Sequence, residues 1–121
     1  MTRAMATLAA LSGLLAAGAA GAGAPGSPER GAAIFQAHCV LCHGPEARGC
    51  GPAARLYLPR PANLTASTRS PEYKAAIIRG GGASMGRSPS MPPWGGELSD
   101  AEIADLVAHL STLERKEDLT C

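Results

Sequence analysis

Two cysteines and a histidine stand together in Cys39-Val40-Leu41-Cys42-His43, and this motif restricts the possible folds more than any other feature of the sequence. Paired cysteines at this spacing serve three chemistries: a redox-active dithiol, half of a zinc site, and covalent attachment of haem. Each chemistry needs different support from the rest of the chain. The remaining sequence can therefore distinguish between them.

The first 22 residues have the layout of a secretory signal peptide. Arg3 is the only charge ahead of an uncharged Ala, Leu and Gly run, and Ala20-Gly21-Ala22 supplies small residues for cleavage. The alternative is an uncleaved membrane anchor, because the uncharged stretch 4–24 is about long enough to span a bilayer. Ala and Gly insert weakly, which favours cleavage. We expect an exported protein with a linker over residues 23–28.

Export and spacing favour haem over the other two chemistries. A zinc site needs two more ligands, and neither Cys50 nor Cys121 forms a second short-spaced pair with a histidine or cysteine. A thioredoxin-like dithiol needs a strand before a helix, and strand-like alternation is missing. Haem attachment uses the whole motif. Cys39 and Cys42 can each form a thioether with a vinyl group, and the His43 imidazole can face the iron.

The composition after the leader supports a bound cofactor. About 99 residues remain, and a domain this small is marginal without a covalent or metal staple. The chain is poor in large side chains, and a bound macrocycle would supply the missing apolar core. Its only aromatic residues are Phe35, Tyr57, Tyr73 and Trp94.

Cap residues and apolar spacing predict three helices separated by Gly- and Pro-rich loops. The first begins at Ser27-Pro28 and carries the motif at its end, over residues 28–43. The loop over 44–67 has at most a turn or two of helix. The second helix begins at Ser70 and ends at Gly80. Its apolar residues are Tyr73, Ala76 and Ile77.

The third helix is the best marked. Ser99 and Glu102 form a capping box, and Leu98 with Ile103 can form a hydrophobic staple. One apolar stripe follows at helical spacing, made of Ile103, Leu106, Val107, Leu110 and Leu113. No strand pattern is present, so the sequence predicts an all-α fold.

From Glu29 to Leu113 the sequence resembles the monohaem class I cytochrome c family. Besides the Cys39–His43 motif, the resemblance includes Gly31 and Phe35, which in the family cross the last helix. The matching partner positions on that helix are Leu106 and Leu110. His109 stands where the family usually has an aromatic residue such as Tyr, and we interpret it as a packing or surface histidine.

The resemblance implies the small cytochrome c fold, with three main helices wrapped around one covalent haem c that is held by two thioethers. The corresponding domain is 29–113, followed by a C-terminal tail over 114–121. In the family a proline carbonyl accepts the second N–H of the proximal imidazole. Both Pro52 and Pro61 qualify here.

The second axial ligand decides what the haem does. Met91 precedes Pro92 and Pro93, which fix the backbone and can hold a weak thioether ligand, as in the distal segment of the family. Met85 lies among glycines without such a constraint. We expect His43 and Met91 to ligate the iron, with Met85 or an open site as alternatives.

His/Met ligation implies a single-electron carrier and not an enzyme, acting by itself or as the haem subunit of an oxidoreductase complex. The expected partners are an oxidase, reductase or dehydrogenase in a bacterial periplasm, and the membrane is reached only through partners or an uncleaved leader. The alternative function is a haem-based sensor or gas-binding module in which Met91 is displaced.

Charge and the two remaining cysteines complete the sequence evidence. Eleven Lys and Arg residues face ten Asp and Glu residues, and without Arg3 the balance is zero. This argues against nucleic acid as a partner.

Cys50 and Cys121 can form a bridge that closes a large loop, or stay unpaired, and the sequence leaves both open.

Overall fold

The structure is a computed structural model that describes residues 25–113 and Cys121. Its elements are helical and these residues contain no strand, which confirms the predicted all-α fold. The predicted signal peptide and residues 114–120 of the predicted tail lie outside the described residues. No helix in the described part is long and apolar enough to cross a membrane. In chain order the elements are α1 (Pro28–His38), α2 (Val40–His43), the 3-10 helix η1 (Ala54–Leu56), α3 (Pro71–Ser84) and α4 (Asp100–Thr112).

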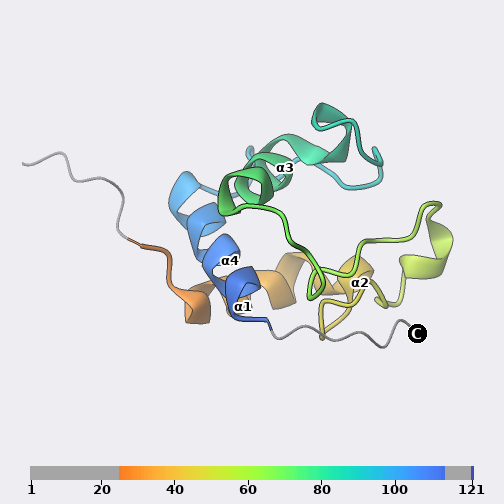
Figure 1. Ribbon diagram of the computed structural model, residues 1–121, viewed down its shortest axis with the longest axis horizontal. Coiled ribbons are helices and arrows are strands. Elements are labelled where there is room, and N and C mark those ends of the chain that lie inside the picture. The colour runs from red at the N-terminus through yellow and green to blue at the C-terminus, as the bar shows by residue number, and fades with distance from the viewer. Residues whose placement is uncertain (1–24, 114–120) are drawn as a thin grey trace, which may run out of the picture.

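Figure 1 shows α1 and α4 crossing, with α3 above them and the long segment between α2 and α3 beside them. This segment contains the single short helix η1, in agreement with the predicted loop. The core lies where the helices meet. Its buried side chains are Phe35, Ala47, Ile78, Leu98, Ile103, Leu106, Val107 and Leu110.

The start of α1 is confirmed, but its predicted extent is wrong. The Ser27 hydroxyl caps the helix by accepting from the amide of Arg30 at 3.3 Å. The helix ends at His38, and Cys39 (φ −111°, ψ −27°) separates it from the short turn α2. The helix does not extend beyond that turn. The carbonyls of Leu41 and Cys42 accept hydrogen bonds from amides of the loop that follows.

The crossing of α1 and α4 depends on Gly31. A Cβ atom there would lie 2.5 Å from the carbonyl carbon of Asp105 and 2.8 Å from the Cβ of His109. Phe35, one turn later, is 1% exposed. Burying a side chain of this kind contributes about 1.5–3 kcal/mol. The close crossing predicted at these two positions is confirmed.

The ends of α3 and α4 follow the predicted caps with one correction. Ser70 caps α3, and the capping box at Ser99 and Glu102 is present in both directions. Gly80 does not end α3, because the break falls at Gly81 (φ 77°, ψ 170°) and one further turn reaches Ser84. Only glycine adopts this conformation without strain.

The apolar side chains of α3 are buried to different degrees. Tyr73, Ala76 and Ile77 are partly buried, whereas the buried side chain is Ile78. Its carbonyl also accepts the amide of Trp94 at 2.9 Å. The helix therefore packs both on α4 and on the segment that follows it.

An ion pair between the exposed Arg30 and the buried Asp105 fastens the start of α1 to α4. Asp105 is 4% exposed and accepts two hydrogen bonds from Arg30, at 2.7 and 2.9 Å, and one from the amide of Ser27 at 2.6 Å. The hydrogen bond from Arg30, followed by the one from Ser27, holds the pKa of Asp105 below its usual range. The spacing of residues within each helix does not predict the pair of Arg30 with Asp105.

Candidate functional site

The three residues of the motif share one turn of backbone. The amides of Cys42 and His43 both donate to the carbonyl of Cys39, at 3.2 and 2.9 Å. Gly44 then turns the chain away with a positive φ of 78°. Both motif thiols are half-buried and neither is in a disulfide. The predicted site residues Cys39, Cys42 and His43 are thus close neighbours.

Burial changes the acidity of the Cys39 thiol. Burial raises its pKa to about 11, and the neighbouring Cys42 thiol adds to the rise. The group is therefore a neutral thiol near pH 7. Addition of this S–H group across a vinyl group forms a thioether.

The imidazole of His43 is oriented by the backbone. Its Nδ1 lies 3.1 Å from the carbonyl oxygen of Ala62, which accepts only if Nδ1 carries the proton. Nε2 is then left with a lone pair that can bind a metal. Burial lowers the pKa of the ring, so it is neutral near pH 7, as a metal ligand must be.

The acceptor is neither of the two prolines that were predicted. The carbonyl of Pro61 instead contacts Gly49, where a Cβ atom would overlap it. A hydrogen bond of 2.8 Å from the amide of Leu64 to Ala47 holds the two loops together. In this register the next carbonyl, that of Ala62, faces the ring.

Met91 is held at its backbone by two glycines of α3. The amide of Gly82 donates to the Met91 carbonyl at 2.9 Å, and a Cβ on Gly82 would lie 3.2 Å from that of Met91. Gly81 packs against Pro92 and Pro93, with 2.8 Å between its would-be Cβ and the Pro93 nitrogen. The half-buried side chain of Met91 packs against the same core cluster as Cys39.

Met85 has a different environment. It caps the end of α3, where its amide donates to the Gly82 carbonyl at 3.0 Å. Gly86 follows with a positive φ, and a Cβ there would meet nothing within 4 Å. Met85 is not among the side chains that pack against the core cluster. The structure therefore gives Met91 the firmer backbone of the two.

His109 is a packing residue, as predicted. It is partly buried, and its ring centroid lies 5.5 Å from that of Phe35 with the rings inclined by 53°. Burial lowers the pKa of His109. Its aromatic ring thus occupies the α1–α4 crossing in the manner of the aromatic residue expected at this position.

The donor set and its surroundings fit a haem. Two thiols outside any disulfide and an imidazole whose Nε2 can bind a metal lie on one turn, and the Met91 side chain packs against the same core. Within the described ranges no group of three or more His, Cys, Asp or Glu residues could hold a metal ion by itself. The partly buried side chains that pack against the core come from each surrounding segment: Ile34, Cys39, Val40, Leu64, Ala75, Met91, Trp94 and Leu113.

Two features of the site escaped the sequence analysis or were left open by it. The role of Ala62 carries no side-chain signal, because a main-chain oxygen is the acceptor. Cys50 and Cys121 form a disulfide. The signal for it was the presence of two cysteines outside the motif in a chain with a predicted export leader.

Comparison with known proteins agrees with this geometry. A search among curated proteins found no significant match. Residues 26–110 match the family described as cytochrome C oxidase, cbb3-type, subunit III, which covers the motif, the methionine strap and most of α4. The chain therefore belongs to this family and is a c-type cytochrome with a haem-based electron-transfer role.

Proposed function

We propose that this protein is a single-electron carrier in which one haem c is bound by thioethers to Cys39 and Cys42, with His43 and Met91 as the axial iron ligands. The bound haem supplies one-electron chemistry, because its iron is stable as Fe(III) and Fe(II). The observation that carries the proposal is the hydrogen bond from His43 to Ala62, which fixes the tautomer and leaves Nε2 available.

The residues around the site have separate tasks. The Ala62 carbonyl holds the Nδ1 proton of His43 and raises the basicity of the ring. The hydrogen bond from Gly82 and the contacts of Gly81 with the two prolines hold Met91 in one position. A ligand held in both oxidation states keeps reorganisation small, which suits electron transfer.

The strap also favours a carrier over a gas sensor. A sensor needs a ligand that leaves readily, whereas the Met91 backbone is fixed by a hydrogen bond and by the packing of two glycines. A soft thioether that stays bound leaves no coordination position for oxygen or another gas. The proposed partners are redox proteins, either free or in one complex with this chain.

The proposed place of action is the bacterial periplasm. This part of the proposal rests on the leader over residues 1–22 and on the cytochrome domain over 29–113. Membership in a family described as an oxidase subunit supports a respiratory partner.

Extraction with acid acetone tests the covalent attachment. The wild-type protein should keep its red colour in the precipitate, and Cys39→Ala combined with Cys42→Ala should release it or fail to accumulate. Cys50→Ser combined with Cys121→Ser is the matched control, because it also removes two cysteines but leaves the motif intact. Haem that is extracted from wild-type protein would contradict the proposal.

A further inference from the structure

The Cys50–Cys121 disulfide lies directly beside the motif. Cys50 belongs to a segment whose amides bind the carbonyls of the motif turn: Gly49 donates to His43 at 2.8 Å, and Gly51 donates to Cys42 at 3.0 Å. Gly51 packs so closely on the turn that a Cβ atom would lie 2.5 Å from the Val40 carbonyl oxygen. The backbone of Cys50 therefore cannot move without disturbing these bonds.

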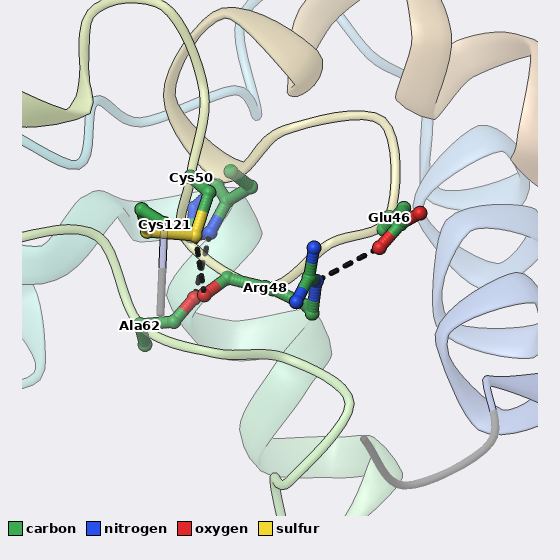
Figure 2. The surroundings of a disulfide bond; sticks show 6 residues. Glu46, Arg48, Cys50, Ala62 and Cys121 are labelled. Carbon is green, nitrogen blue, oxygen red and sulfur yellow. Dashed lines mark hydrogen bonds and ion pairs between the residues drawn. A yellow bond between two sulfur atoms is a disulfide. The ribbon is translucent and has the colours of Figure 1, made fainter. Parts of the chain in front are cut away.

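The same segment also holds the acceptor of His43. A Cβ on Gly49 would lie 3.2 Å from the carbonyl carbon and oxygen of Ala62, so the two loops are in contact. In Figure 2, Ala62 lies in the surroundings of the Cys50–Cys121 disulfide, and its carbonyl oxygen accepts the hydrogen bond of His43 Nδ1. The disulfide is thus attached to the loop pair that sets the His43–Ala62 hydrogen bond.

The disulfide connects this loop pair to a distant part of the chain. Cys50 and Cys121 are 71 residues apart in sequence, and their Cα atoms lie 5.3 Å apart. The covalent ring that it closes includes α3, Met91 and α4. Opening the ring would release Cys50 from the polypeptide that follows α4.

The bond is open to a reagent. Cys121 is exposed, Cys50 is half-buried, and both line a cavity of about 440 Å³. Arg55 and Arg60 line the same cavity and are exposed. Positive charge stabilises a leaving thiolate, and a better leaving group speeds thiol–disulfide exchange.

We propose that the Cys50–Cys121 disulfide positions the acceptor of His43, and that its cleavage by a dithiol changes the haem potential. A thiolate of the dithiol forms a bond to the Cys121 sulfur, the Cys50–Cys121 bond breaks, and Cys50 leaves as a thiolate that takes up a proton. The second thiol of the reagent then displaces Cys121. Two electrons and two protons pass to the protein, and the reagent becomes a disulfide.

The direction of the effect follows from the hydrogen bond, and it rests on the proposed function of His43 as an iron ligand. A firm bond from Nδ1 to Ala62 makes the imidazole more basic, which favours Fe(III). Loosening the loop weakens that bond, so the disulfide-free protein should have the higher midpoint potential. The amides of Gly49, Gly51 and Leu64 should also exchange with solvent faster.

The test compares the disulfide-bonded and disulfide-free holoprotein. Native protein is treated with dithiothreitol, its free thiols are blocked with iodoacetamide, and the modification at Cys50 and Cys121 is counted by mass spectrometry. Midpoint potential and amide exchange are then measured on this sample and on Cys121→Ser. We expect a positive shift in potential and faster exchange at the three amides in both.

Arg30→Ala is the matched control, because it loosens the α1–α4 contact without touching the loop at Cys50. An equal shift in Arg30→Ala would overturn the proposal, as would an unchanged potential in protein shown to lack the disulfide. A bond that resists dithiothreitol until the protein is denatured would also overturn it. A different result would contradict the proposed function: untreated wild-type protein would lose its haem to acid acetone. Amide exchange would still show in that case whether the disulfide holds the loop.

Discussion

At the residue scale, Met91 is held through its main chain. The amide of Gly82 donates to its carbonyl, and the absence of a side chain at Gly81 and Gly82 lets α3 approach the strap. The contacts that hold Met91 are made by its main chain, whereas the proposed ligand atom belongs to its side chain. The ligand can therefore be removed without removing the strap.

Met91→Ala should keep the covalent haem, lower the midpoint potential and abolish the weak red absorption band that thioether ligation gives to ferric haem c. The reason is the loss of a soft ligand that favours Fe(II). Met85→Ala is the matched control and should leave the potential and the band unchanged. Loss of the band in Met85→Ala would reverse the assignment of the ligand.

Gly82→Ala tests the close approach of α3. The new Cβ would overlap the Ser88 carbonyl oxygen and press on Met91, so we expect the free energy of unfolding to fall by about 1–3 kcal/mol. Gly96→Ala is the control, because a Cβ there meets nothing within 4 Å. Denaturant titration of both holoproteins measures the difference. Equal stability of the two variants would contradict the proposed role of Gly82.

At the scale of elements, the contact of α1 with α4 combines apolar packing with one ion pair, of which only the carboxylate is buried. Arg30 is largely exposed, whereas Asp105 is almost fully buried. The carboxylate accepts bonds from Arg30 and from the Ser27 amide, which ties the cap of α1 to the middle of α4. Removing Asp105 leaves Arg30 in solvent, so no charge is stranded in the core.

This ion pair should make the contact sensitive to acid. The pKa of Asp105 is lowered in the folded protein, so its stabilisation is present above the unfolded pKa of about 3.9 and is lost as pH falls through the folded pKa. The free energy of unfolding of wild type minus that of Asp105→Asn should therefore be largest near neutral pH and shrink below about pH 4. A difference that stays constant with pH would contradict this account.

The elements also show what the sequence could predict. Ser27, Ser70 and Ser99 cap their helices as expected, because a cap depends on residues only three positions apart. The position of the α3 break at Gly81 and the burial of Ile78 depend on packing against segments distant in sequence. Such contacts leave no local pattern.

The candidate site also has features that local sequence predicts and features that depend on contacts between distant segments. The grouping of Cys39 and His43 is local and was predicted, whereas the acceptor at Ala62 depends on the register between two loops. The sequence predicts no role for Asp105, since a carboxylate on a helix is usually solvated. Its partner Arg30 lies 75 residues away and is found only in the fold.

At the scale of the whole molecule, the chain has a small core and two kinds of covalent link. Among the residues that the structure describes, the largest fully buried side chains are Phe35, Ile103 and Leu106. A domain of this size needs covalent cross-links or a bound metal or cofactor to be stable. The disulfide is one, and the proposed thioethers to haem are the other.

Cys121→Ser should lower the free energy of unfolding of the holoprotein by about 4 kcal/mol, the chain-entropy value for closing a ring with a sequence separation of 71 residues. Thermal or denaturant unfolding measures the change, with haem absorption as one probe and circular dichroism as the other. Protein reduced with dithiothreitol should match the variant. A change well under 1 kcal/mol would mean that the ring contributes little.

Exposure of the ferrous wild-type protein to carbon monoxide tests the central claim most directly, because it asks whether the iron has a position free for a gas. The claim is that His43 and Met91 hold the iron from both sides and that the strap keeps Met91 bound. The absorption spectrum should then stay unchanged under saturating carbon monoxide, while Met91→Ala should bind the gas. Rapid binding by the wild-type protein would contradict the electron-carrier account and favour a sensor.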